Sequence, residues 1–175
     1  MSDRDCHCLS RAIQAMSETT VEIRAATMDD LDQLVVQWID LAAGQREYGS
    51  HLRTESNRTR ISELFARRIA QDEARIARSG DRIVGFVTFT MAGSTFAKSS
   101  TRGVIQNLYV VPEARGEGVG TQLLDVAERV LAEDGADAIA LEAMADNDMA
   151  RQFYRDRGYQ PHRVTFEKSV ESDTS

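Results

Sequence analysis

The chain has 175 residues, of which 42% are hydrophobic and 28% are charged, with two prolines. This length and composition predict one domain with a hydrophobic core and exclude a disordered protein. The formal net charge of -7, without a basic stripe, argues against nucleic acid as the main partner. The longest uncharged run, residues 83–97, is shorter than the roughly 20 apolar residues of a membrane span.

The N-terminal residues 1–19 are predicted to form a flexible appendage, and Met16 offers an alternative start. They carry charges where a secretory signal would have its apolar segment, so a cytoplasmic protein is expected. Cys6 and Cys8 flank His7, but structural zinc takes four ligands and the chain has only two cysteines. The sequence therefore predicts no metal site.

The first half of the domain begins with strand and helix patterns. An alternating apolar stretch predicts a strand, and two segments with apolar residues at helical spacing predict helices on either side of a polar loop. Gly44 is expected to end the first helix. A Ser-Gly-Asp turn between two apolar runs predicts a hairpin. The expected elements are a strand at 21–27, helices at 28–44 and 56–72, and the hairpin at 74–93.

The second half continues with alternating strands and helices. Pro112 should end one strand, Gly135 should end a long amphipathic helix, and Asn147 is placed to cap a short helix that stops before Gly158. The order indicates an α+β domain around one mixed sheet, over residues 20–171, with a tail at 172–175. The expected elements are strands at 101–111, 137–144 (buried) and 161–170, and helices at 118–134 and 147–157.

The sequence RGEGVG, residues 115–120, places alternating glycines where a strand meets a helix. Such glycines leave backbone N–H groups uncovered near the positive end of the helix dipole, which suits a phosphate or pyrophosphate. A Walker loop is excluded because no lysine follows Gly120. The dinucleotide fingerprint remains an alternative, although its glycine spacing differs and it would turn directly after the strand.

These residues resemble the GCN5-related N-acetyltransferases (GNAT). RGEGVG looks like the pyrophosphate loop of that family, LYVVPEA (108–114) like the strand end before it, and ARQFYRDRGY (150–159) like its last helix. The resemblance covers roughly residues 21–170. It implies a mixed, mostly antiparallel sheet flanked by helices, in the order β-α-α-β-β-β-α-β-α-β.

The resemblance implies acetyl-CoA as co-substrate and no metal. The pyrophosphate would rest on the loop backbone, and Arg115 could add a charged contact. The end of the preceding strand would leave backbone groups unpaired for the acetyl group. The residues expected to contact acetyl-CoA are Leu108, Tyr109, Val110, Arg115, Gly116, Glu117, Gly118, Val119, Gly120, Thr121 and Asn147.

Two side chains are expected to move protons. An alkylamine is protonated near neutral pH, so a base or a water relay must accept a proton, and Glu142 is the candidate base. Tyr154 is the candidate acid for the departing thiolate, because a phenol stays protonated at neutral pH. Glu142, Asn147 and Tyr154 have the spacing of the branch that acetylates protein N-termini, including ribosomal proteins.

The acceptor is left open. The resemblance points to Trp38, Arg46, Tyr48 and His51 as acceptor-side residues. The aromatic segment and C-terminal tyrosine pair of the N-terminus-acetylating branch are missing, so a small amine is at least as well supported as a protein N-terminus. The alternative function is a noncatalytic acyl-CoA-binding sensor. The sequence predicts no membrane partner and does not distinguish a monomer from a homodimer.

Overall fold

A computed structural model describes residues 20–51, 53, 55–93 and 100–168. The chain divides into two compact units, the first ending at Glu142 and the second beginning at Ala143. The predicted appendage at 1–19, with its cysteines, and the predicted tail at 172–175 lie outside the described residues. The single domain predicted over 20–171 stays a prediction.

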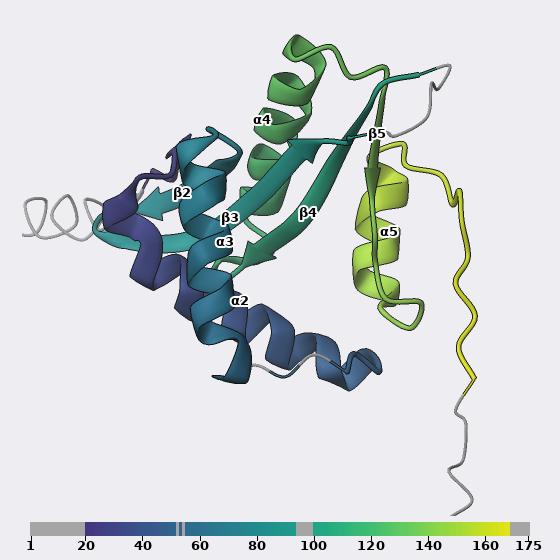
Figure 1. Ribbon diagram of the computed structural model, residues 1–175, viewed down its shortest axis with the longest axis horizontal. Helices are drawn as coiled ribbons and strands as arrows, with labels where there is room; N and C mark the ends of the chain where they lie inside the picture. The colour runs from purple at the N-terminus through teal and green to yellow at the C-terminus, as the bar shows by residue number, and fades with distance from the viewer. Residues whose placement is uncertain (1–19, 52, 54, 94–99, 169–175) are drawn as a thin grey trace, which may run out of the picture. The chain divides into compact units, whose positions relative to one another are not determined.

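A five-stranded sheet forms the centre of the first unit (Figure 1). The strands follow one another in space as they do in the sequence, and all neighbours are antiparallel except the last pair, which is parallel. The hairpin predicted around Gly80 is present, with that glycine at a φ of 60°. The strands are β1 (Glu22–Ala25), β2 (Ala74–Ser79), β3 (Arg82–Met91), β4 (Arg102–Val110) and β5 (Ala138–Leu141).

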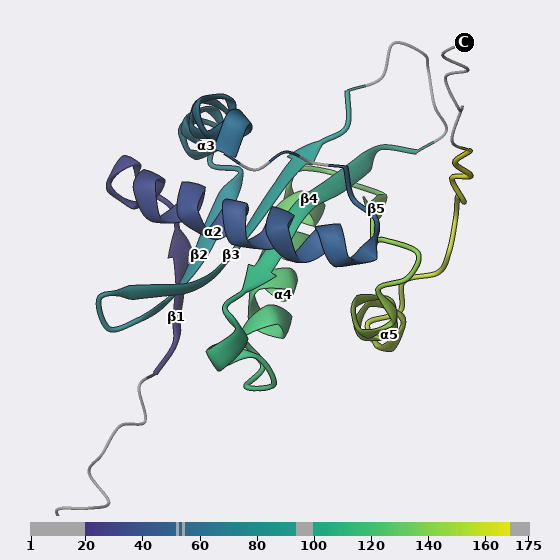
Figure 2. The ribbon, with the colours of Figure 1, turned by 90° about the horizontal axis from the view of Figure 1, so that it is seen from below.

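Helices cover both faces of this sheet (Figure 2). Phe65 packs against Phe86 of β3 with ring centroids 5.4 Å apart, which places its helix on one face. The neighbouring Gly85 points to the other face, where an added Cβ would lie 3.1 Å from Leu123. The first unit contains η1 (Met28–Asp30), α2 (Leu31–Gln45), η2 (Arg46–Tyr48), η3 (Glu55–Asn57), α3 (Arg58–Ala70), η4 (Pro112–Ala114) and α4 (Val119–Glu133).

The mixed, mostly antiparallel α+β fold that the sequence predicted is thus confirmed. The prediction that Gly44 ends the first long helix is wrong. Gly44 lies inside α2, and the helical segment continues through η2 to Gly49, which has a φ of 88°. A left-handed residue is what stops a helix, and a glycine in the helical conformation does not supply it.

The second unit contains α5 (Asp148–Asp156). The predicted cap is present, since the Asn147 side chain accepts a hydrogen bond of 3.0 Å from the Ala150 N–H, and Gly158 follows the helix with a φ of 87°. Tyr154 lies in ring contact with Phe153 and Tyr159, with centroids 5.3 and 5.9 Å apart.

Two strand predictions at the C-terminal end need correction. The strand expected at 161–170 is not formed over its described residues, 161–168, where Val164 and Phe166 are 73% and 93% exposed. Alternating apolar residues suit a strand, but a strand needs a neighbour to pair its backbone groups. The strand expected to be buried at 137–144 is shorter, and its residues are exposed or half-buried.

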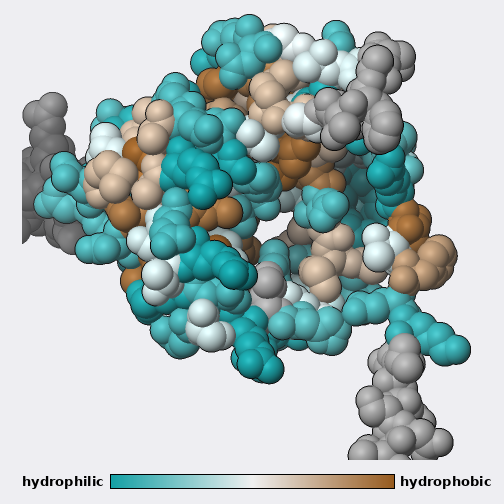
Figure 3. Space-filling view, in the orientation of Figure 1, coloured by the Kyte–Doolittle hydropathy of each residue, from teal (hydrophilic) through white to brown (hydrophobic). Residues whose placement is uncertain are grey.

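The surface of the described residues carries few large apolar side chains. Hydrophobic residues on the face shown in Figure 3 form small separate patches among hydrophilic ones. In the first unit the large apolar side chains that are exposed are Met28 and Val36, near the start of α2. Scattered residues of this kind are ordinary surface and do not by themselves mark an interaction site.

Candidate active site

The loop between β4 and α4 contains two of the three alternating glycines of the sequence RGEGVG, and the third, Gly120, lies in the first turn of α4. Gly116 and Gly118 both have a φ of 80°, a conformation that glycine adopts without steric cost. An added Cβ on either would meet no heavy atom within 4 Å among the described residues, apart from its chain neighbours. The loop therefore needs glycine for its backbone shape, and space lies open beside that backbone.

The loop leads directly into the N-terminus of α4. Gly118 is the N-cap residue, and among the described residues no side chain caps this end by a hydrogen bond. The first N–H groups of a helix lack intrahelical partners, and the helix dipole makes this end positive. Val119, the first residue of α4, is buried, whereas Glu117 in the loop is exposed. These features fit a pyrophosphate lying across 115–121, which includes Gly120 and Thr121 in the first turn.

The Arg115 side chain lies against β4. Its Nε donates a hydrogen bond of 2.9 Å to the Val110 carbonyl oxygen, and its guanidinium carbon lies 5.9 Å from the ring centroid of Tyr109. The Tyr109 ring is buried and contacts Phe86. Burial, together with the charge of Asp40, raises the pKa of Tyr109. The Nε of Arg115 is thus directed to the strand, and the charged phosphate contact expected for this residue stays a prediction.

β5 pairs with β4 over all four of its residues, and β4 continues beyond this paired segment to Val110. Their pairing runs from Arg102 opposite Ala138 to Ile105 opposite Leu141. The next residue, Gln106, is an extra residue in the β3–β4 register, because Thr88 pairs with Asn107 and Phe89 pairs with Ile105. A bulge bends the strand that carries it.

The last residues of β4, up to Val110, therefore lie beyond the part of this strand that pairs with β5. Leu108, Tyr109 and Val110 pair with Val87, Phe86 and Gly85 of β3. The Val111 N–H donates to the Val84 carbonyl. Backbone groups alternate along an antiparallel ladder, so those of Tyr109 point to β3, whereas those of Leu108 and Val110 point away from it. This is the edge at which the sequence analysis expected unpaired backbone groups.

The two proton-transfer candidates belong to different units. Glu142 follows β5, is exposed, and is the last residue of the first unit. Tyr154 lies on α5 in the second unit, where burial raises its pKa and keeps the phenol protonated. Asn147, expected to contact acetyl-CoA, uses its side-chain oxygen to cap α5. Glu142 thus belongs to the first unit, and Asn147 and Tyr154 belong to the second.

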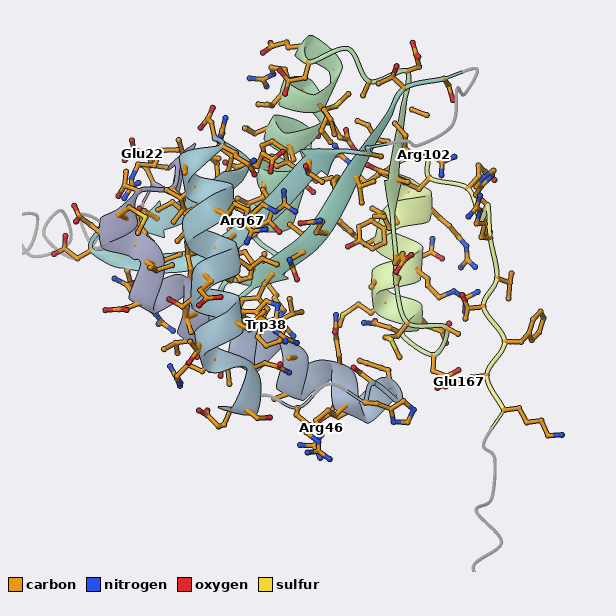
Figure 4. All side chains as sticks on the ribbon, in the orientation of Figure 1. Glu22, Trp38, Arg46, Arg67, Arg102 and Glu167 are labelled. Carbon is orange, nitrogen blue, oxygen red and sulfur yellow. The ribbon has the colours of Figure 1, made fainter. Side chains whose placement is uncertain are left out.

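The acceptor-side candidates are distributed along α2 and the residues after it. Trp38 is 7% exposed and belongs to the core. Arg46 is exposed and Tyr48 half-buried, both in η2, and His51 is exposed just beyond Gly49. Figure 4 shows Arg46 at the far end of the helical segment from which Trp38 projects. The structure thus separates Trp38, as a core residue, from the three surface candidates.

The sequence analysis missed a polar group on the β3–β4 part of the sheet. The Asn107 amide donates to the Thr88 hydroxyl at 2.8 Å, and Thr90 donates to Glu73 at 2.6 Å. Glu73 is also paired with Arg68 of α3. The only signal in the sequence was the pair of threonines at alternate positions of an otherwise apolar strand.

Neither a metal site nor a membrane span is found in the part of the chain that the structure describes. No three histidine, cysteine, aspartate or glutamate residues are grouped there so that they could hold a metal ion. Among the same residues, every helix is too short or too polar to cross a bilayer.

Comparison with known proteins identifies the family. Residues 37–159 match the model of the acetyltransferase (GNAT) family. The chain is 30% identical over 134 residues to an uncharacterized N-acetyltransferase of Archaeoglobus fulgidus, a match that covers 77% of this chain and 89% of that protein.

Two relatives have names that indicate a class of substrate. One has a lower sequence identity, and the other aligns over a smaller part of both chains. The aminoalkylphosphonate N-acetyltransferase of Salmonella typhimurium is 26% identical, over 85% of this chain and 91% of its own. N-alpha-acetyltransferase 30 of Schizosaccharomyces pombe is 33% identical, over 48% of this chain and 55% of its own.

The fold is also that of solved acetyltransferases. A GCN5-related N-acetyltransferase from Ralstonia eutropha superposes with a TM-score of 0.69 at 24% identity, over 86% of this chain and 98% of its own. The family model spans the glycine loop, β4, β5 and α5. The chain therefore belongs to the GNAT family of acetyltransferases.

Proposed function

We propose that this protein transfers the acetyl group of acetyl-CoA to a primary amine, by direct attack within a complex of both substrates. The observation that carries the proposal is the loop at 115–121, where two left-handed glycines border open space in front of an uncapped helix N-terminus. Acetyl-CoA supplies an activated acetyl thioester, and its pyrophosphate is the anion that this loop suits.

The edge of β4 supports a place for the acetyl group. The backbone N–H groups of Leu108 and Val110 point away from β3 and lie beyond the part of β4 that pairs with β5. Donors fixed in this way stabilise the negative charge that develops on the thioester oxygen during attack. Because these donors are held by the sheet, they do not have to reorganise during the reaction.

Glu142 and Tyr154 are proposed to handle the protons. The Glu142 carboxylate, alone or through a water molecule, takes a proton from the incoming ammonium so that the amine can attack. The raised pKa of Tyr154 supports its part as the acid that protonates the departing thiolate, because the phenol retains its proton at neutral pH.

The acceptor is proposed to be the amine of a small molecule or of a protein N-terminus. The match to the aminoalkylphosphonate enzyme extends over most of both chains, whereas the match to N-alpha-acetyltransferase 30 covers about half of each, which favours the small molecule. Arg46, Tyr48 and His51 are the proposed acceptor-side residues. Trp38 is proposed to support them only as part of the core.

The proposal is tested by incubating the protein with acetyl-CoA and a panel of amines. The panel includes aminoalkylphosphonates, simple diamines and short peptides with free N-termini. We expect thiol release that depends on one class of amine, and a product heavier by one acetyl group in mass spectrometry. Acetyl-CoA binding with no modified amine across the panel would instead support the noncatalytic acyl-CoA sensor.

A further inference from the structure

The backbone around Val110, the last residue of β4, makes hydrogen bonds on both sides of the strand. On the β3 side, the ladder continues past it, with Val111 donating to Val84 at 2.9 Å. The backbones approach closely there, since a Cβ on Gly85 would lie 2.7 Å from the Tyr109 carbonyl oxygen. On the other side, the Arg115 Nε donates to the Val110 carbonyl oxygen at 2.9 Å.

The Arg115 guanidinium is itself supported by a ring. It lies over Tyr109, which is 7% exposed and packed against Phe86. An arginine over an aromatic face gains a cation–π contact and loses part of its freedom to turn elsewhere. The side chain thus links the start of the glycine loop back to the end of β4.

The hydrogen bond at Val110 has an electrostatic consequence. In a strand the N–H and C=O of one residue point to the same edge, so the Val110 oxygen lies beside the Val110 N–H. An uncompensated carbonyl oxygen would repel negative charge that develops near that N–H. Arg115 covers this oxygen with a donor and brings a positive charge to the same edge.

We propose that Arg115 is a positioning residue for acetyl transfer, which fixes and electrostatically covers the Val110 carbonyl group so that the N–H of the same residue can receive the thioester oxygen. This inference rests on the proposed acetyl-CoA-dependent function. It replaces the phosphate contact that the sequence suggested for Arg115. The pyrophosphate is then held by the loop backbone and the α4 N-terminus, with no required contribution from this side chain.

The test compares Arg115→Met, which removes the donor and the charge, with Arg115→Gln, which keeps a donor at similar reach. The control is Arg82→Met, because Arg82 is an exposed arginine near the same loop, 3.6 Å from Glu113. Two quantities are measured by methods that need no acceptor. One is the Kd for CoA from calorimetry, and the other is the carbonyl stretching frequency of bound, ¹³C-labelled acetyl-CoA from infrared difference spectra.

We expect the wild type to lower the carbonyl frequency relative to free acetyl-CoA, because the thioester oxygen accepts a hydrogen bond. Arg115→Met should lose most of this shift and Arg115→Gln should retain it. All three variants should bind CoA within about threefold of the wild type, since the loop backbone is unchanged. Once an acceptor is known, kcat of Arg115→Met should fall by about ten- to a hundredfold with little change in KM for acetyl-CoA.

Three results would overturn the inference. In the first, Arg115→Met weakens CoA binding by more than about tenfold and keeps the carbonyl shift, which would make Arg115 a phosphate ligand. In the second, Arg115→Met changes neither quantity. In the third, the wild type binds acetyl-CoA without any carbonyl shift, which would leave the proposed function standing. A wild type that binds no CoA would instead refute the proposed function, and this inference with it.

Discussion

The proposed acetyl-CoA side and the proposed acceptor side of this protein are specified in different ways. On the first side, the backbone carries the proposed site, through Gly116, Gly118, the uncapped start of α4 and the edge of β4 beyond its pairing with β5. On the second side, the candidates are surface side chains on η2 and the loop after it. Backbone geometry restricts which residue can stand at a position, whereas surface side chains vary with little cost to the fold.

The family can therefore be identified from the chain, whereas the acceptor amine cannot. A pyrophosphate held by backbone N–H groups restricts the shape of the loop that binds it. The amines that the relatives acetylate differ, as the names of two of them indicate. The following substitutions test the comparison, starting with the one that should have the largest effect.

Gly118→Trp should abolish acetyl-CoA binding, with a loss of more than about a hundredfold. The indole would enter the open space beside the loop, and the residue would be strained at a φ of 80°. The measurement is a calorimetric titration with acetyl-CoA. Gly80→Trp is the matched control, because Gly80 also has a positive φ and open space but lies in the β2–β3 hairpin.

Both variants should lose about 1–2 kcal/mol of unfolding free energy from backbone strain. Only Gly118→Trp should lose binding. If both variants bind equally well, the pyrophosphate does not lie across this loop. If both lose binding, the effect comes from instability and not from the site.

Tyr154→Phe should lower kcat by about a hundred- to a thousandfold and leave the Kd for acetyl-CoA near the wild-type value. The substitution removes the hydroxyl and keeps the ring that packs with Phe153 and Tyr159. Tyr159→Phe removes a hydroxyl from the same ring cluster and is the control. Equal rates for the wild type and Tyr154→Phe would end the assignment of Tyr154 as the acid.

The direction of the Tyr154 pKa adds a pH test. Burial raises that pKa above its ordinary value of 10.0, so the protonated acid persists as the pH rises to 10. Wild-type kcat should therefore show no decline between pH 8 and about pH 10 that is due to Tyr154. A decline in that range that disappears in Tyr154→Phe would contradict the raised pKa.

Glu142→Gln should lower kcat by about ten- to a hundredfold near neutral pH. The defect should shrink at alkaline pH, because more of the acceptor amine is then neutral without help from a base. The measurement is the ratio of wild-type to variant kcat between pH 7 and pH 10. A ratio that stays constant over this range would assign the proton transfer elsewhere and leave Glu142 as an exposed residue at the end of β5.

Asp30→Asn should leave acetyl-CoA binding unchanged and affect only stability. Asp30 is buried at the start of α2, where it accepts hydrogen bonds from Arg24 and Thr27. We expect a loss of about 1–3 kcal/mol of unfolding free energy, measured in urea. A change in the Kd for acetyl-CoA would show that α2, which leads to the acceptor-side residues, also shapes the acetyl-CoA side.

The stabilisation by Asp30 should also depend on pH. Burial alone would raise the pKa of Asp30, but hydrogen bonds from Arg24 and Thr27 outweigh it and hold that pKa below its ordinary value of 3.8. The native state therefore favours the ionised form, and the contribution is complete above the unfolded-state pKa. The difference in unfolding free energy between wild type and Asp30→Asn should shrink as the pH falls below about 4.

The part of the fold that the sequence predicted correctly follows from local rules. The order of strands and helices up to Gly158 and the glycine loop depend on hydrophobic spacing, caps and the conformations that glycine permits. The end of α2 at Gly49 did not follow, since Gly44 and Gly49 look alike in sequence and only the second adopts the left-handed conformation.

The remaining differences depend on contacts that a sequence pattern does not contain. The motif specified an arginine at position 115, but not that its Nε would donate to Val110. The segment around Val164 alternates as a strand would, but pairing requires a neighbour with free backbone groups. The bulge at Gln106, which precedes the edge of β4 proposed for the acetyl group, depends on register with β3 and has no local signature.

We propose above that the glycine loop and the edge of β4 bind acetyl-CoA. The most direct test is a calorimetric titration of the purified protein with acetyl-CoA, with NADH as the control ligand. We expect saturable binding of acetyl-CoA at one site per chain and no heat of binding with NADH. Binding of NADH without acetyl-CoA would contradict this proposal and would assign the loop to a dinucleotide.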